Sequence, residues 1–222
     1  MKPADAVNAA TPQKPASGRW IVAGLVLLSL IPAIAGSMRL VEIASGAPLT
    51  PANARFLSSP LPALLHIGPS MVCSLLGALQ FAAGFRRRHP RWHRLAGRIL
   101  VPAGLAVSIS GLWMALAYPW PQGDGVGVFV ERLLFGSAML ATMLLGVYAL
   151  WRRRFIQHGQ WMLRAYAIGM GAGTQVFTHL PWFLFVDAKP GETTRTVMMG
   201  LGWVINIIVA EWIIRRPPTP TA

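Results

Sequence analysis

The sequence is poor in negative charge and in charged residues of either sign. Seven of its 222 residues are acidic and 12% are charged, whereas a soluble domain has about 25% charged residues. Apolar residues make up 54% of the chain and gather in runs of about 20, the length that crosses a bilayer. Soluble helices of that length carry a polar face, which these runs mostly lack. The composition therefore predicts an all-α, polytopic membrane protein with a single domain.

The sequence also lacks the motifs of common catalytic sites. Cys73 is its only cysteine, which excludes an intramolecular disulfide and a cysteine-based zinc site. No phosphate-binding loop, zinc-protease motif, nucleophile elbow or dinucleotide fingerprint is present. No catalytic residue is predicted, and the sequence does not favour an enzyme.

Positive charge is abundant, with 20 lysines and arginines and a formal net charge of +13. It is concentrated in short segments between apolar runs, where basic residues set the orientation of membrane helices. No motif for reading bases or the phosphate backbone accompanies it. We therefore expect no nucleic-acid partner, and the expected partners are the lipid bilayer and its anionic headgroups.

Six apolar runs predict six transmembrane helices within a domain at 19–216. Their approximate ranges are 20–38, 61–85, 95–118, 128–151, 161–185 and 196–214. Residues 1–18 are too polar to order themselves and are expected to form a disordered tail, with a second tail at 217–222. Residues 32–36 contain an A-x-A-like pattern of signal-peptide cleavage sites. An uncleaved first helix is the preferred interpretation, because the apolar run continues past that pattern.

Two basic segments determine the predicted orientation. Residues 86–98 carry six arginines and two histidines without an acid, and residues 152–164 carry four arginines. Together with both ends of the chain, they give one side of the membrane the whole net charge of +13 and leave the other side neutral. Six helices put both termini on the same side, and this asymmetry predicts that the side is cytoplasmic. The expected location is the inner membrane.

The two basic segments also indicate an internal repeat. Each follows an apolar run, opens with three arginines, reaches a histidine and ends with an arginine in the next run. In this interpretation the second and third helices and the fourth and fifth helices are duplicated hairpins. Two ordinary cytoplasmic loops explain the same pattern, and the distance from histidine to arginine differs by one residue between them. The sequence leaves both interpretations open.

Polar groups at membrane depth are costly and are therefore the candidate site residues. They are His66, Gln80, Gln175, His179 and Asn206. From His66 to Gln80, small and polar residues recur at helical spacing, so this face is expected to meet protein rather than lipid. These residues predict a polar interior around the second, third and fifth helices, as in a transporter-like or accessory membrane protein.

Paired histidines favour an alternative function. His66 and His179 are expected at similar depth near the outer face, and such a pair ligates haem iron or a transition metal, or passes a proton. His93 and His158 form a weaker pair on the cytoplasmic side. The alternative is therefore a b-type haem or metal-binding electron carrier. The competing interpretation is that each histidine only hydrogen-bonds a neighbouring helix.

Arg98 and Arg164 lie just inside the helices that follow the basic segments. Long arginine side chains at such positions reach back to the membrane interface. We expect both to be interface arginines that meet helix ends or lipid phosphates.

Several of these motifs together resemble a known family. They are His66, the Gly-Ala-Leu-Gln-Phe run at 77–81, the His-Arg-Leu-Ala-Gly-Arg run at 93–98, and His158 followed by Trp-Met-Leu-Arg at 161–164. The set is similar to a family of predicted bacterial membrane proteins known as domain of unknown function 2306. The resemblance covers most of the chain after about residue 60. It implies a multipass bundle and no established activity, and the sequence departs from the pattern at Gly159, where a basic residue is expected.

Overall fold

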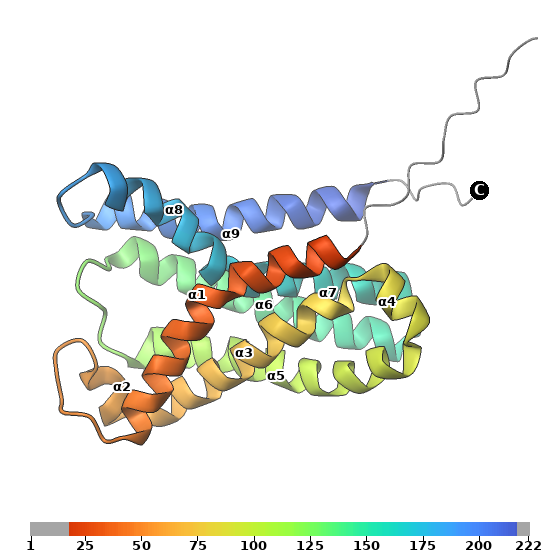
Figure 1. Cartoon of the computed structure of the whole chain (residues 1–222), viewed down its shortest axis with the longest axis horizontal. Coiled ribbons are helices and arrows are strands. Elements are labelled where there is room, and N and C mark those ends of the chain that lie inside the picture. The colour runs from red at the N-terminus through yellow and green to blue at the C-terminus, as the bar shows by residue number, and fades with distance from the viewer. Residues whose placement is uncertain (1–17, 217–222) are drawn as a thin grey trace, which may run out of the picture.

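The computed structural model describes residues 18–216, which fold into nine helices (Figure 1). These are α1 (Gly18–Ala44), α2 (Ala54–Ser58), α3 (Pro60–Gln80), α4 (Ala83–Arg88), α5 (Pro90–Ala117), α6 (Val126–Trp151), α7 (Phe155–Gly169), α8 (Gly171–Phe185) and α9 (Glu192–Arg215). Five of them are long and apolar enough to cross a membrane, namely α1, α3, α5, α6 and α9. The all-α class with several spanning helices is confirmed. The tails predicted at the two ends lie outside the described residues, apart from Gly18.

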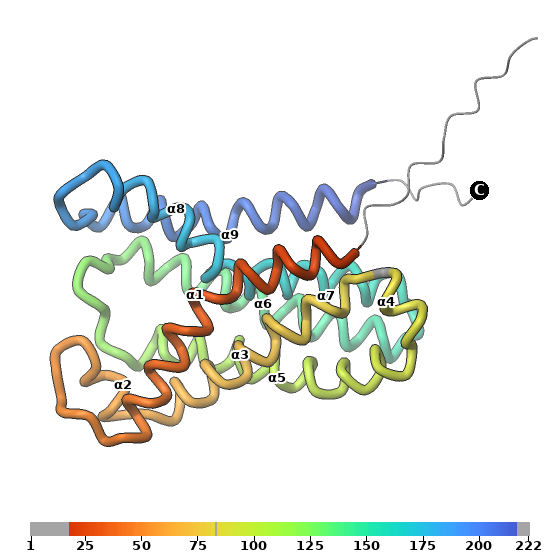
Figure 2. The backbone as a smooth tube through the Cα atoms, viewed as in Figure 1, coloured from red at the N-terminus to blue at the C-terminus, as the bar shows by residue number. Residues whose placement is uncertain are grey.

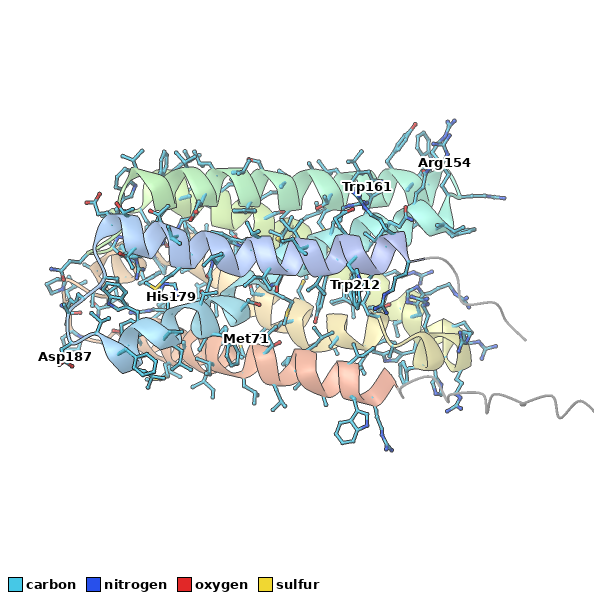
Figure 3. All side chains as sticks on the ribbon, turned by 90° about the horizontal axis from the view of Figure 1, so that it is seen from above. Met71, Arg154, Trp161, His179, Asp187 and Trp212 are labelled. Atoms are coloured by element: carbon cyan, nitrogen blue, oxygen red, sulfur yellow. The ribbon has the colours of Figure 1, made fainter. Side chains whose placement is uncertain are left out.

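The helices lie along one long axis and form a bundle with two distinct ends (Figure 1). The α4 end carries α4 and the turn between α6 and α7, and the α2 end carries α2 and the turns at 118–125 and 186–191. Gly18 lies against Ala82 at the α4 end, where α9 also finishes. Figure 3 shows Arg154 and Asp187 at the two opposite ends. Both basic segments and both described ends of the chain are therefore gathered at the α4 end.

Apolar side chains cover the outside of the bundle as well as its core. Val107, Met139 and Ile168 form a buried cluster from α5, α6 and α7. Large apolar residues stay exposed on the long helices, for example Leu27, Trp113, Leu134 and Ile208, as well as Phe183 on α8. A soluble monomer rarely exposes so much apolar surface, whereas lipid tails solvate it.

The single helix predicted at 161–185 is wrong, because the structure divides it at Met170 into α7 and α8. Figure 2 follows the chain through this change of direction. Three glycines surround the break: Gly169, Gly171 and Gly173. Glycine is about 1 kcal/mol less favourable than alanine inside a helix, so this segment resists continuous helix formation. A Cβ on Gly171 would lie 2.4 Å from Cδ1 of Trp203, so the break also lets α8 approach α9 closely.

The break packs against a bend in α1 (Figure 1). Pro32 has no N–H to donate to the carbonyl of Leu28, and a proline inside a helix bends it. A Cβ on Gly173 would lie 2.3 Å from the Leu28 carbonyl oxygen, so glycine is required for this approach. The Ser29 hydroxyl also lies 3.9 Å from Sδ of Met170. The bent α1 thereby holds the start of α8.

The predicted helix at 61–85 is also too long, because α3 ends at Gln80 and α4 is separate. Ala82 between them takes an extended conformation, with φ −74° and ψ 90°. The Phe81 ring packs on Tyr166 of α7 at 4.8 Å, and Gly18 meets Ala82. The boundary between α3 and α4 is therefore accompanied by contacts with α7 and α1. The sequence between Gln80 and Ala83 contains no glycine or proline that would indicate it.

Candidate functional site

A cavity of about 450 Å³ lies inside the bundle. At the α2 end its lining includes Arg55, Arg132 and the exposed Trp120, so the cavity reaches the surface there. From this end it extends to His66 and Ser70 of α3. The volume falls within the range of small-molecule sites, which is about 300–1,000 Å³.

His66 is held in the cavity wall by α5. Its Nδ1 lies 3.0 Å from the carbonyl oxygen of Val107 and 3.3 Å from the hydroxyl of Ser110. The ring also packs on Gly111, where a Cβ would lie 3.2 Å from Cε1. An Nδ1–H that donates to a carbonyl leaves Nε2 as an acceptor. No group within residues 18–216 hydrogen-bonds this Nε2.

Most other polar side chains of the lining are bonded to backbone carbonyl groups. The hydroxyls of Ser29, Ser74 and Ser108 donate to carbonyls three or four residues earlier, at 2.7–3.2 Å. Gln175 donates from Nε2 to the Met199 carbonyl of α9 at 3.1 Å. Apolar and sulfur-containing side chains form the rest of this wall, chiefly Met71, Met114, Phe135, Met139, Met170, Met199 and Trp203. The body of the cavity is therefore largely apolar.

A buried carboxylate organises the α2 end. Asp124, whose side chain is 2% exposed, lies 2.5 Å from Nη2 of Arg132 and accepts a hydrogen bond from Nε of Arg195. It thus joins the starts of α6 and α9. Glu131 precedes Arg132 in the sequence and points to α9, where a Cβ on Gly200 would lie 2.3 Å from Oε1. These residues are not among the site residues predicted from the sequence, which shows only charge in turns and helix starts at these positions.

Arg55 is a cation of the cavity lining that pairs with no carboxylate within residues 18–216. Its guanidinium and that of Arg39 lie 4.5 and 4.3 Å from the centroid of the Phe56 ring. Arg39 pairs with Glu42. The buried Nε of Arg55 has no hydrogen-bond partner in the described chain. Burial lowers the pKa of Arg55, and the positive charge of Arg132 lowers it further.

Tyr118 lies in the same part of the lining. Its hydroxyl donates to the carbonyl of Ser59, and its ring meets Phe56 edge-on at 5.7 Å. A tyrosine phenol is neutral at physiological pH, and burial raises the pKa of this one further. Tyr118 is therefore a neutral hydrogen-bond donor rather than a second charge.

The predicted histidine pair of the outer side does not share the cavity. His66 is part of the lining, whereas His179 is not. Nδ1 of His179 lies 2.7 Å from the carbonyl of Gln175 in its own helix, and its ring stacks on Phe183 at 6.4 Å.

Asn206 and Gln80 occupy other places in the bundle. Asn206 accepts a hydrogen bond from Thr174 of α8 at 2.8 Å and donates to the Ala167 carbonyl of α7 at 3.1 Å. Gln80 has a buried Nε2 that no group of the described chain hydrogen-bonds. Arg86 donates to the backbone carbonyl of Gln80 at 3.3 Å.

His93 and His158 lie on α5 and α7 at the α4 end. Nδ1 of His158 lies 2.9 Å from the carbonyl of Gly146. Nδ1 of His93 is buried and has no partner within residues 18–216. Both histidines of the inner pair therefore lie at the α4 end of the bundle.

The two predicted interface arginines differ in their surroundings. Arg98 is exposed. Arg164 makes a two-point contact with Glu211 of α9, from Nε at 2.5 Å and from Nη2 at 3.1 Å. Arg164 also lies 4.6 Å from the centroid of the Trp161 ring. Figure 3 shows Trp161 and Trp212 toward the end that carries Arg154.

Comparison with known proteins gives one match. No curated protein and no solved structure matches this chain. A family model described as predicted membrane protein, domain of unknown function 2306, matches residues 63–214. The match extends from α3 to α9 and includes His66, His93 and His158. The chain belongs to this family of predicted membrane proteins.

Proposed function

We propose that the protein crosses the inner membrane six times and binds a small molecule in its central cavity, as a transporter-like or accessory protein. The five long helices supply five crossings, and α7 with α8 supplies the sixth. Each of these two has 15 residues, about 22 Å at 1.5 Å per residue, which is short of a hydrocarbon core of about 30 Å. Joined end to end, they are long enough to span it.

Charge supports the orientation of this arrangement. Six crossings put both termini on the side of the basic segments, which the positive-inside rule assigns to the cytoplasm. The α2 end, with its cavity opening, then faces away from the cytoplasm. A ligand enters from that side.

The cavity is the observation that carries this proposal. Its lining includes Arg55 at the α2 end and His66 of α3, and it continues past them along a largely apolar wall to Ser74 and Met139. Helix irregularity at membrane depth is tolerated where it lines a cavity, and Gly169 and Met170 at the break between α7 and α8 belong to this lining. A polar-ended chamber that opens to one side is what a solute-binding membrane protein requires.

Cysteine accessibility tests the opening. Cys73 is replaced by serine to remove the only native thiol. Ser70→Cys then places a thiol in the cavity lining, and Ser137→Cys places one on the exposed surface of α6. A membrane-impermeant thiol reagent outside intact spheroplasts is expected to label Ser70→Cys and not Ser137→Cys. The reagent reacts with a thiolate in water, and a thiol at position 137 would face lipid, where it stays protonated. Failure to label Ser70→Cys before denaturation, with labelling afterwards, contradicts the proposed opening.

A haem- or metal-binding electron carrier is the second candidate, because of two histidine geometries. His66 and His158 each hold Nδ1 beside a backbone carbonyl, at 3.0 and 2.9 Å. Metal-ligating histidines usually donate their other N–H in this way, which leaves Nε2 for the metal. The candidate ligands are His66 with His179, and His93 with His158.

The visible spectrum of the purified protein tests the second candidate. A Soret band that disappears when either histidine pair is replaced by alanine identifies the ligands. A protein purified without a Soret band and without stoichiometric metal rejects this function. A Soret band that survives both double replacements rejects the ligand assignment.

A further inference from the structure

We infer that the cavity binds an amphiphile with an anionic head, which Arg55 holds at the α2 end while the apolar body lies among the methionines. This inference rests on the proposed ligand-binding function and specifies its ligand class. It depends on the charges at the mouth of the cavity and on the chemistry of its walls.

The mouth carries more positive charge than its ion pairs neutralise, because four arginines face two carboxylates. Arg39 pairs with Glu42, and Arg132 shares the buried Asp124 with a further arginine, Arg195. Arg55 has no carboxylate within ion-pair distance among residues 18–216. A partly buried cation without a partner is costly, and an anion bound there removes that cost.

The charged residues of the lining select the sign of the charge on the ligand. They are Arg55 and Arg132, and no acidic residue of the described chain belongs to the lining. The carboxylate of Asp124 is already held between two arginines. A cationic head or a divalent metal ion therefore meets repulsion at this opening, whereas a carboxylate or a phosphate meets donors.

The body of the cavity selects an apolar tail. Its serine hydroxyls and the Gln175 amide are mostly bonded to backbone carbonyls, so the wall offers few free polar atoms. Five methionines form much of this wall, and their flexible side chains accommodate apolar groups of different shape. A small hydrophilic anion would leave this wall unfilled. An acyl chain fits it.

Myristate binding to the full-length protein tests this inference. The protein is placed in phosphatidylcholine nanodiscs, and radiolabelled myristate retained by empty nanodiscs is subtracted. Myristyl alcohol has the same chain without the charge, and butyrate has the charge on a short chain. We expect saturable myristate binding. Myristyl alcohol is expected to bind at least about tenfold more weakly because it lacks the charged hydrogen bond, and butyrate at least about tenfold more weakly because it lacks most of the apolar chain.

Variants of the head site give the decisive comparison. Arg55→Gln is expected to weaken myristate binding about tenfold, and Arg55→Lys to retain most of it, because lysine keeps the charge. Arg154→Gln removes an exposed arginine at the α4 end and is expected to bind as the unchanged protein does. Size-exclusion chromatography checks that each variant elutes as a single monodisperse species, which separates loss of binding from misfolding.

Three results would overturn the inference: unchanged binding by Arg55→Gln, equal binding of the alcohol and the acid, or no saturable binding of myristate or phosphatidylglycerol. Adding phosphatidylglycerol to the nanodiscs identifies the source of the ligand. Competition with myristate assigns it to an anionic bilayer lipid, and lack of competition assigns it to a free acid. If Ser70→Cys is labelled while Arg55→Gln binds normally, the cavity function stands and only this ligand class fails.

Discussion

At the scale of single residues, Asp124 is the carboxylate that compensates the charge of two arginines at the α2 end. It is almost fully buried and contacts Arg132 in the second turn of α6 and Arg195 in the first turn of α9. Removing one partner of a buried ion pair leaves the others uncompensated, whereas a pair on the surface contributes little. Its position in a turn gives no hint of this role.

Asp124→Asn is expected to destabilise the protein by about 3 kcal/mol, because two partly buried arginines lose their carboxylate. For a chain of this size, that lowers the midpoint of thermal unfolding by about 6–12 °C. Asp187→Asn is the matched control, since Asp187 is exposed and makes no ion pair within the described chain. Equal midpoints for the two variants would show that the ion pairs at Asp124 contribute no stability.

At the scale of helices, two irregularities depend on each other. The bend of α1 at Pro32 exposes the Leu28 carbonyl, and the break before α8 presents Gly173 to it. Neither would pack in this way against a straight helix. The wall of the cavity is built at this contact, because Ser29, Pro32 and Gly173 all belong to the lining.

Gly173→Ala is expected to destabilise the fold by about 1–3 kcal/mol, since the new Cβ meets a backbone oxygen that cannot move aside. Gly159→Ala is the control, because nothing lies within 4 Å of a Cβ at that helical position. The control is expected to raise stability slightly through helix propensity. Thermal unfolding in detergent measures both, and a rise for Gly173→Ala would refute the close approach.

The register of α3 and α5 leads to another prediction. His66 lies beside Val107, and Cys73 Sγ lies 3.8 Å from the Leu100 carbonyl, so contacts step by seven residues in opposite directions. The next step places Gln80 opposite His93, and both carry a buried nitrogen without a partner in the described chain. A hydrogen bond between them would satisfy both nitrogens.

Oxidative cross-linking measures this register. In the Cys73→Ser background, Gln80→Cys with His93→Cys is expected to form a disulfide readily. Gln80→Cys with Leu95→Cys is the comparison, because Leu95 is exposed on another face of α5. Preferential cross-linking of the second combination would mean that the seven-residue register does not extend to the α4 end.

At the scale of the whole molecule, the number of membrane crossings determines on which side of the membrane the C-terminus lies. Five crossings would separate the termini, and six put them together. Alkaline phosphatase fused after Pro121 is expected to be active outside the cytoplasm, and a fluorescent reporter fused after Pro217 is expected to be active inside. An active cytoplasmic reporter at Pro121 would reverse the orientation, and an external reporter at Pro217 would leave only five crossings.

The sequence by itself determined the class of this protein. The length of an apolar run and the charge of the segments beside it are local properties, so they can be read without knowing which helices meet. The family resemblance was also visible in short motifs, and the family match confirms it. His66 was recognised as a candidate because a polar group at membrane depth is conspicuous wherever its neighbours lie.

Only the tertiary structure decided where the helices break and which residues share the cavity. The break at Met170 follows from contacts with α1 and α9 that involve residues far away in the sequence, such as Leu28 and Trp203. Arg55 and Asp124 lie in connecting segments, where the sequence shows charge but not its partner. Burial, pairing and cavity shape depend on which helix faces meet, and that depends on the packing of the whole bundle.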